Sequence, residues 1–265
     1  MNAKLLIKKL LQSTLGIENY LNVFQKYLIY TSSSKVLKKT KYFTNKFKDL
    51  NCLIDLIHKG DVCVDIGANV GLYTIRMAKA VGKTGKVYSF EPITLNYNTI
   101  LKSMDNFLKK IIIANKTIVG NVCNKIQILL PQEEGVFLHG LSHVAHSNSS
   151  EKGLLEEVDA ITLDDYFSSI KIKINFIKCD VEGYEFNVLK GAKKILLTHR
   201  PTILCEIWNN PQLHCTFEFL ENLGYSPFYV DQATLKKVDK TSQDWVNKND
   251  YFFLPDYKNL PTREN

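Results

Sequence analysis

Two glycines and two polar residues form a turn that is suited to holding a small ligand. Asp65, Gly67, Asn69 and Gly71 follow an apolar run at residues 62–66 in a D-x-G-x-N-x-G pattern. Glycine lets the backbone approach a bound molecule closely, while a carboxylate at position 65 attracts a cation and repels a diphosphate. The spacing differs from G-x-G-x-x-G, the arrangement that carries a dinucleotide diphosphate to a helix N-terminus. The turn therefore predicts a site for a cationic ligand.

A second carboxylate follows twenty residues after this turn. Glu91 ends the next apolar run, residues 87–90, a position from which a carboxylate receives the hydroxyl groups of an adenosine ribose. Together the turn and Glu91 fit S-adenosylmethionine, whose ammonium and sulfonium are positive and whose one carboxylate the amide groups of the turn would hold. The alternative is a tight strand-to-helix turn followed by a helix-capping Glu91.

A third group of carboxylates follows the apolar run at residues 174–179. Methyl transfer is an in-line displacement, so alignment and exclusion of water supply most of the acceleration. A hydroxyl acceptor also needs a base, which contributes about a hundredfold to ten-thousandfold. Asp180 is the predicted base, and Glu182 is predicted to orient the acceptor or share the proton, because neighbouring carboxylates raise one pKa. Glu185 is expected to interact with the dipole of the following helix rather than to act in catalysis.

Three histidines, His139, His143 and His146, fall within eight residues. Histidine ligands of a metal usually come with carboxylate partners on a defined element, whereas these lie in a polar segment, so no metal site is predicted. His143 is the one predicted to contact the acceptor. A divalent ion at Asp180 and Glu182 is an alternative, although no third ligand stands at a suitable spacing.

The elements that position these residues alternate between apolar strands and amphipathic helices. This pattern predicts one α/β domain over residues 51–265, with a mostly parallel sheet and helices on both faces. Residues that follow parallel strands then meet at the carboxyl edge of the sheet. The signal weakens between residues 116 and 165, where a strand at 125–130 and a long polar loop over the sheet are expected. The expected strands are residues 62–66, 87–90, 111–114, 174–179, 202–207, 226–230 and 251–254, with helices at 72–78, 93–108, 185–197 and 217–224.

The first 50 residues differ in charge from the remainder of the chain. They hold ten lysines against Glu18 and Asp49, a net +8, whereas the remaining 24 basic and 25 acidic residues nearly cancel. Six apolar residues at helical spacing predict one or two amphipathic helices packed on the main domain: Leu6, Leu10, Ile17, Leu21, Phe24 and Leu28. A contact with a membrane surface or an acidic partner is the alternative. No nucleic-acid binding is predicted, because the aromatic residues do not alternate with basic ones.

The composition bounds the class of protein. The chain has 265 residues, of which 45% are hydrophobic and 23% charged, as in a globular protein with a substantial core. No stretch approaches eighteen uncharged apolar residues and lysines interrupt the only apolar start, so a cytoplasmic location is expected, with a peripheral membrane contact left open. The six cysteines form no C-x-x-C pair and are expected to be free and mostly buried.

Three blocks of sequence resemble the successive motifs of the FkbM-type S-adenosylmethionine-dependent methyltransferases. They are VDIGANVG at 64–71, FEP at 90–92 and KCDVEGYE at 178–185 followed by VLKGA at 188–192. Further similarity lies at ITLDDY, 161–166, before the third block, and at DYFF, 250–253, in the final strand. The similarity covers about residues 56–255, and residues 115–150 match only at Ser142, His143 and Val144.

The resemblance implies a Rossmann-like class I methyltransferase sheet of seven strands with the last one antiparallel. The apolar spacing in residues 1–50 predicts a small helical segment before this domain. The resemblance also implies O-methylation of a carbohydrate or another hydroxylated small molecule. A nucleotide-cofactor oxidoreductase on a similar sheet is disfavoured by the glycine spacing and by Asp65. A non-catalytic adenosylmethionine-binding or scaffold protein remains the other alternative. The sequence does not indicate an oligomeric state.

Overall fold

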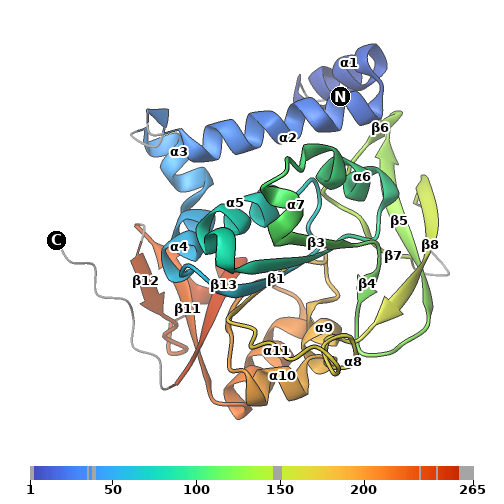
Figure 1. Cartoon of the computed structure of the whole chain (residues 1–265). Helices are drawn as coiled ribbons and strands as arrows, with labels where there is room; N and C mark the ends of the chain where they lie inside the picture. The colour runs from blue at the N-terminus through green and yellow to red at the C-terminus, as the bar shows by residue number, and fades with distance from the viewer. Residues whose placement is uncertain are drawn as a thin grey trace.

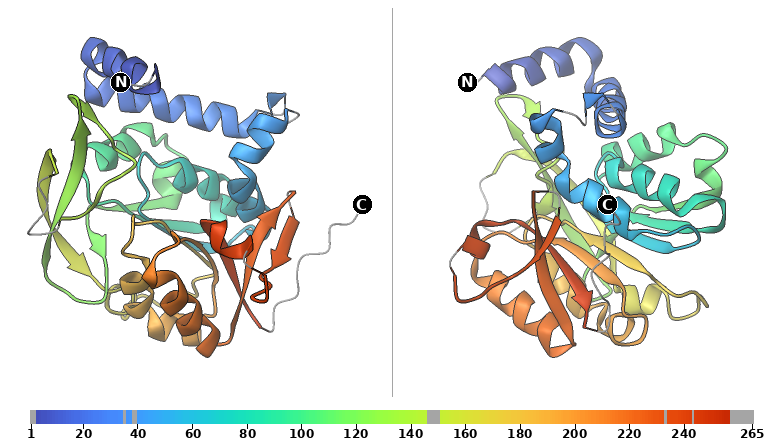
Figure 2. Two further views of the ribbon diagram at one scale, coloured as in Figure 1. Left: turned by 180° about the vertical axis from the view of Figure 1, so that it is seen from behind. Right: turned by 90° about the vertical axis from the view of Figure 1, so that its left-hand side faces the viewer.

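The protein is built around one twisted eight-stranded sheet with helices on both faces (Figures 1 and 2). The computed structural model describes residues 3–34, 36–37, 40–145, 151–232, 234–242 and 244–256. The strand order is β12-β11-β13-β10-β9-β1-β2-β3. The first strand, β1, lies between β2 and β9, so the order of the strands reverses there. The carboxyl ends of these three strands form the crevice in which open α/β sheets bind ligands.

Six strands of this sheet run in one direction, as a mostly parallel sheet requires, and two, β12 and β13, run in the opposite direction. β13 runs antiparallel to both β10 and β11, and β12 runs antiparallel to β11. The prediction of seven strands is wrong by one, because β12 adds an edge strand. β12 is short, mostly exposed and lysine-bearing, so it lacks the apolar pattern by which a buried strand is recognised. The strands are β1 Val62–Ile66, β2 Lys86–Phe90, β3 Ile112–Asn115, β9 Phe176–Cys179, β10 Thr202–Glu206, β11 Tyr225–Asp231, β12 Thr234–Lys237 and β13 Asp250–Pro255.

Successive residues of each central strand are buried on opposite faces of the sheet. In β1, Cys63 packs with α4, α5 and α7 on one face, while Val64 and Ile66 pack with α8 to α11 on the other. β9 alternates in the same way from Phe176 to Ile177. This two-residue period decides on which face each polar residue of a strand lies. The helices are α4 Lys48–Leu56, α5 Leu72–Val81, α6 Thr94–Ser103, α7 Leu108–Ile111, α8 Leu163–Tyr166, α9 Glu185–Lys190, α10 Lys193–Thr198 and α11 Pro211–Asn222.

The helix expected over residues 185–197 is two helices, α9 and α10. Gly191 lies at the break, where an added Cβ would come within 1.9 Å of the carbonyl oxygen of Gly120. The carboxylate of Asp164 accepts hydrogen bonds from the N–H groups of Lys194 and Ile195, both at 2.9 Å, and so caps the start of α10. Both partners come from distant segments, so the helical period alone could not reveal the break.

A second, smaller sheet replaces the long loop that was expected between residues 116 and 165. Its strands are β4 Ile118–Val119, β5 Lys125–Glu133, β6 Val136–Phe137 and β8 Gly153–Ile161, and β7 His143–Val144 pairs with β5. The expected strand at 125–130 is confirmed as part of β5, but the loop prediction is wrong. β8 is exposed along its first half, so it shows little of the apolar signal on which the prediction relied. The polar run at 147–150 lies outside the described residues.

The N-terminal segment forms α1 Ala3–Leu15, α2 Ile17–Ser33 and the short α3 Lys41–Lys46. α2 runs along the outside of α5 and α6, and α1 crosses its end beside β6 (Figures 1 and 2). Leu21 is buried on the main domain as predicted, but Leu6 and Leu10 are 54% and 65% exposed. The expectation that all six apolar positions face the domain is therefore wrong for α1. Residue 50, the predicted domain boundary, lies within α4.

Candidate active site

The predicted ligand-binding residues surround a cavity at the carboxyl ends of β1, β2 and β9. The space between its walls, including the part open to solvent, is about 570 Å³. The loop after β1 forms one wall, Glu91 and the start of α6 a second, and the loop after β9 a third. The small sheet closes the fourth side with β4, β5 and β7. Six of the eight predicted site residues line the cavity, namely Gly67, Asn69, Glu91, His143, Asp180 and Glu182.

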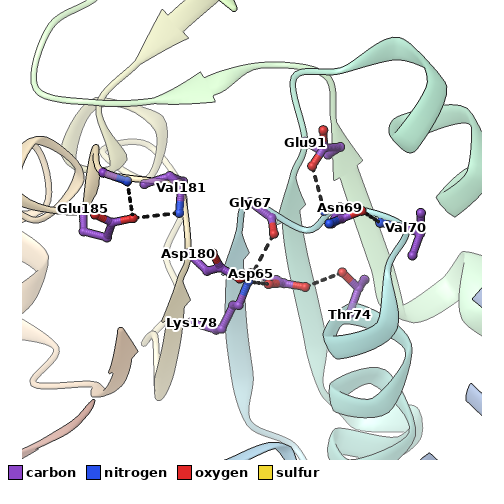
Figure 3. Close-up of polar contacts among 11 residues, drawn as sticks. Asp65, Gly67, Asn69, Val70, Thr74, Glu91, Lys178, Asp180, Val181 and Glu185 are labelled. Atoms are coloured by element: carbon purple, nitrogen blue, oxygen red, sulfur yellow. Dashed lines mark hydrogen bonds and ion pairs between the residues drawn. The ribbon is translucent and has the colours of Figure 1, made fainter. Parts of the chain in front are cut away.

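Asp65 does not line this cavity, because its side chain lies on the other side of the turn (Figure 3). The carboxylate is fully buried and accepts a 2.5 Å hydrogen bond from the hydroxyl of Thr74 in α5. It shares a sheet face with Cys63, and the parallel register places it directly opposite Lys178. Burial raises the pKa of Asp65 although Lys178 and Thr74 act to lower it. The cation nearest to the Asp65 carboxylate is thus the Lys178 ammonium. A direct contact between Asp65 and a cofactor stays a prediction.

Lys178 is the residue that sequence reasoning missed. Its ammonium lies 3.0 Å from Asp180 Oδ2 and 3.8 Å from Asp65 Oδ1, and it donates to the carbonyl of Gly67 at 3.1 Å (Figure 3). Burial by itself lowers the pKa of Lys178, but the two carboxylates outweigh burial and raise it above its ordinary value. The lysine therefore joins the loops after β1 and β9. A lysine in an otherwise apolar strand, two residues before Asp180, was the available signal.

Each backbone N–H group of the turn after β1, from Gly67 to Gly71, donates a hydrogen bond within the protein. The N–H groups of Gly67 and Ala68 donate to the carbonyl of Phe90, and that of Asn69 donates to Glu91 Oε2 at 2.7 Å. Val70 donates to the side chain of Asn69, and Gly71 to the carbonyl of Ala68. These amides are therefore hydrogen-bonded within the protein, and a contact between them and a ligand carboxylate stays a prediction.

The backbone angles and one further contact define the conformation of this turn. Gly67 and Asn69 have φ of +74° and +50°, a region open to glycine and tolerated by asparagine. Gln25 of α2 donates its side-chain N–H to the carbonyl of Val70. Gly71, with φ of +84°, packs behind the turn near Ile100 rather than at the cavity. The N-terminal segment is thus part of the structure that holds the site.

Glu91 is buried at the base of the cavity. Its carboxylate accepts hydrogen bonds from the N–H groups of Asn69 and Ile93 and from the side chain of Asn96 at 3.3 Å. Burial raises the pKa of Glu91 to about 7, although these bonds lower it. A carboxylate has roughly four acceptor positions, so three bonds leave room for one ligand hydroxyl. Asn96 Oδ1 is buried without a hydrogen-bond partner and adds a second acceptor at the same wall.

The loop after β9 presents Asp180 and Glu182 to the cavity. Glu182 and Gly183 have φ of +51° and +95°, so the chain turns sharply. Glu185 holds this turn, because its Oε1 accepts from the N–H groups of Val181 and Gly183, both at 3.0 Å (Figure 3). Glu185 is therefore a structural residue at the start of α9. Burial, together with the nearby Asp180 and Glu185, raises the pKa of Glu182 to about 7.

Two of the three histidines line the cavity, and His146 lies outside the described residues. Both ring nitrogens of His143 are engaged, Nδ1 at 2.9 Å from the carbonyl of Leu141 and Nε2 at 3.2 Å from Glu151. His139 is buried between Asn69 and the ring of Phe24, and burial lowers its pKa to about 4. His139 is thus neutral at physiological pH. Within the described segments, no group of three or more His, Cys, Asp or Glu side chains is placed to hold a metal ion.

A second cavity, of about 420 Å³, opens on the other side of the turn. The two cavities share Gly67, Asn69, His139 and Asp180 in their walls. The second is closed by Phe24 and Leu28 of α2 and by the start of α5, including Tyr73. Asp180 is therefore the one carboxylate that both cavities share in their linings, among the residues that the structure describes.

The sheet is mixed, and an acidic cavity lies at the switch point of its parallel strands, the position at which open α/β folds bind their ligands. The family described as the methyltransferase FkbM domain matches residues 65–227, well over half of the chain, and the chain belongs to this family. The comparison with curated proteins gives no match. The resemblance inferred from the three sequence motifs is confirmed.

Among solved structures, a methyltransferase FkbM from Methylobacillus flagellatus KT is similar over 87% of this chain, with 15% identity and a TM-score of 0.52. The chain spans 57% of the length of that protein, and the similarity supports the methyltransferase-like fold. An S-adenosylmethionine-dependent O-methyltransferase from Thermotoga maritima has 14% identity over 83% of this chain and 67% of its own, with a TM-score of 0.43. Aeropyrum pernix fibrillarin with bound S-adenosylmethionine has 11% identity over 75% and 67%, with a TM-score of 0.44.

Proposed function

We propose that this protein transfers a methyl group from S-adenosylmethionine to a hydroxyl oxygen of a carbohydrate or another small hydroxylated acceptor. The observation that carries the proposal is the charge of the first cavity. Glu91, Asp180 and Glu182 line it, and no lysine or arginine does so among the residues that the structure describes. Lys178 pairs with Asp180 from outside this lining, and three carboxylates against this one cation favour a positively charged ligand and disfavour a diphosphate. Adenosylmethionine, when bound, supplies a methyl group on a positively charged sulfur.

The walls of the first cavity fit the two ends of this cofactor. Glu91 and the unpartnered Asn96 Oδ1 accept hydrogen bonds from ribose or adenine donors. Phe90, Ile118 and Val119 form an apolar wall that suits the flat adenine ring. Asp180 and Glu182 at the other end lie where the positive charge would be neutralised. The nicotinamide-cofactor alternative requires a diphosphate site, and the cavity offers it no positive side chain.

Asp180 is the proposed base for the acceptor hydroxyl. It lies in the walls of both cavities, so it can contact the acceptor and the transferred group together. Lys178 holds its Oδ2 at 3.0 Å, which leaves Oδ1 to accept the proton. Glu182 is proposed to orient the acceptor, and His143 to contact it from β7.

The first test is a binding measurement. Isothermal titration calorimetry with S-adenosylmethionine, S-adenosylhomocysteine and NAD should give binding for the first two and none for NAD. The Glu91→Gln variant should bind the cofactor more weakly, whereas Glu133→Gln, an exposed carboxylate of β5, should bind it normally. Binding of NAD alone would contradict the proposed cofactor.

The second test measures turnover. Incubation with methyl-labelled cofactor and a panel of sugars and other hydroxylated molecules, followed by identification of the labelled product, should give an alkali-stable methyl ether. Cofactor binding without transfer to any member of a broad panel or to a cell extract would favour the alternative of a non-catalytic binding protein. A product that carries the labelled methyl group on nitrogen or carbon would support methyl transfer but would contradict a hydroxyl acceptor.

A further inference from the structure

α1 turns its apolar side chains away from the protein. Leu6, Ile7 and Leu10 are 54%, 59% and 65% exposed, whereas Leu5 and Gln12 are only 8% exposed. At 3.6 residues per turn, Leu5 and Gln12 lie on one side of the helix, and the three exposed residues lie on the opposite side. A surface helix normally packs in the reverse orientation, with its apolar side on the core. The apolar face of α1 is thus open to solvent.

The orientation of α1 is fixed by a two-point contact with the small sheet. The side-chain amide of Gln12 donates to the carbonyl of Phe137 at 3.1 Å, and the N–H of Phe137 donates to Gln12 Oε1 at 3.0 Å. Both bonds are partly buried, and they attach α1 to β6. A rotation that brought Leu6 and Leu10 onto the domain would break both of them. The exposed face is therefore a consequence of specific contacts.

α2, which lies beside α1 at one edge of the molecule (Figures 1 and 2), carries a second exposed apolar stripe. Val23, Tyr27 and Tyr30 are 57%, 48% and 69% exposed at a spacing of four and three residues, so they form one stripe. Leu21 and Gln25, on the opposite side of the helix, are buried on the domain. We call the exposed residues Leu6, Ile7, Leu10, Val23, Tyr27 and Tyr30 the outer face.

Lysines border the outer face. Lys4 and Lys9 flank the apolar residues of α1, and Lys26 lies beside the stripe of α2; all three are exposed. Within the described residues 3–34 the only acidic residue is Glu18, whose carboxylate pairs with Lys102 at 2.5 Å. Apolar and tyrosine side chains bordered by lysines are typical of helices that lie in the interfacial region of an anionic membrane.

We propose that the outer face binds the surface of a membrane that contains anionic phospholipids. Leu6, Ile7 and Leu10 would enter the boundary between headgroups and acyl chains, and the lysines would contact the anionic headgroups. The contact is peripheral, since none of the helices described is long and apolar enough to cross a bilayer. A second copy of this chain is a less suitable partner, because a symmetric contact would bring the lysines of the two outer faces together.

Vesicle binding of the full chain, measured by co-sedimentation without cofactor, tests this proposal independently of the proposed function. The protein should sediment with vesicles of phosphatidylcholine and about one third phosphatidylserine, and not with pure phosphatidylcholine. The Leu6→Asn/Leu10→Asn variant and the Lys4→Glu/Lys9→Glu variant should each lose at least roughly tenfold in binding. Leu197→Asn is the matched control, because Leu197 is 50% exposed on α10, at the far end of the molecule from α1.

Circular dichroism and cofactor titration should show that all three variants keep their fold, since each substituted side chain is exposed. Equal vesicle binding of the wild type and both outer-face variants would overturn the proposal. The proposal would also be overturned if the wild type does not bind the vesicles and light scattering shows a dimer that the Leu6→Asn/Leu10→Asn variant does not form. The outer face would then be a contact between two copies of the chain.

Discussion

Replacing Lys178 by methionine should remove a large part of the free energy of unfolding of the protein. Lys178 has 6% of its side chain exposed, and the Asp65 carboxylate 3.8 Å away is fully buried. Methionine keeps the length and most of the apolar contacts of the lysine but removes its charge and its bond to the carbonyl of Gly67. The Asp65 carboxylate then has only Thr74 to stabilise its negative charge.

The expected magnitude follows from the geometry. At an effective dielectric constant of about 20, two unit charges 3.8 Å apart attract by about 4 kcal/mol. Measured losses on removing one partner of a buried pair are similar, about 3–5 kcal/mol. Because the total stability of a domain is about 5–15 kcal/mol, Lys178→Met should lose a third or more of it.

The loss should also depend on pH. Burial raises the pKa of Asp65 above its unfolded value, so removing Lys178 raises it further. A carboxyl group with a raised pKa in the folded state destabilises the protein as pH rises, because the folded form retains a proton that the unfolded form has released. The loss of stability caused by Lys178→Met should therefore be largest at pH 8 and should decrease toward pH 5.

Reversible urea unfolding, followed by circular dichroism, measures these differences. The double variant Lys178→Met/Asp65→Asn should recover most of the loss, because it removes the unpaired charge. Lys193→Met, a substitution of an exposed lysine on α10, is the control and should change stability little. Two results would contradict this prediction. One is a free energy of unfolding of Lys178→Met within about 1 kcal/mol of the wild-type value at pH 8, and the other is a double variant that is no more stable than Lys178→Met.

Three further predictions concern the cavity itself. Asp180→Asn should slow methyl transfer by about a hundredfold or more and should weaken cofactor binding by a smaller factor. Single-turnover rates and calorimetry separate the two effects, and an undiminished rate removes Asp180 as the base. Because the pKa values of Glu91 and Glu182 are raised to about 7, cofactor affinity should increase about tenfold from pH 6 to pH 8 as they ionise, and calorimetric affinities that stay flat with pH would contradict their role. In Gly67→Ala the added Cβ would lie 1.7 Å from the carbonyl oxygen of Asp180, so the melting temperature should fall and cofactor binding should be lost; normal binding would mean that the two loops are not held as described.

Much of the fold was predictable because the central strands are buried on both faces. The runs at residues 62–66, 87–90, 111–114, 202–207 and 251–254 each agree with a strand of the structure to within two residues. Continuous apolar runs bounded by glycine or polar residues carry this information locally. The edge strand β12 and the partly exposed β8 lack such runs, so they were missed.

The candidate site was predictable at the residues that follow strands. Glu91, Asp180 and Glu182 end or follow β2 and β9, and the topology brings them to one cavity whatever the details of packing. His143 reaches the same cavity only because β7 pairs with β5. The position of the Asp65 side chain was harder to predict. Asp65 lies within β1, so the two-residue alternation of the strand decides on which face of the sheet its side chain lies.

The sequence by itself determined which strands end in acidic loops and that the N-terminal segment is basic and amphipathic, since both properties are local in the chain. Only the tertiary structure decided that Asp65 faces Lys178 beneath the turn, that a small sheet closes the cavity, and that α1 exposes its apolar face. Each of these depends on the register or rotation of one element against another. That choice is made by contacts between residues far apart in the chain, such as Gln12 with Phe137.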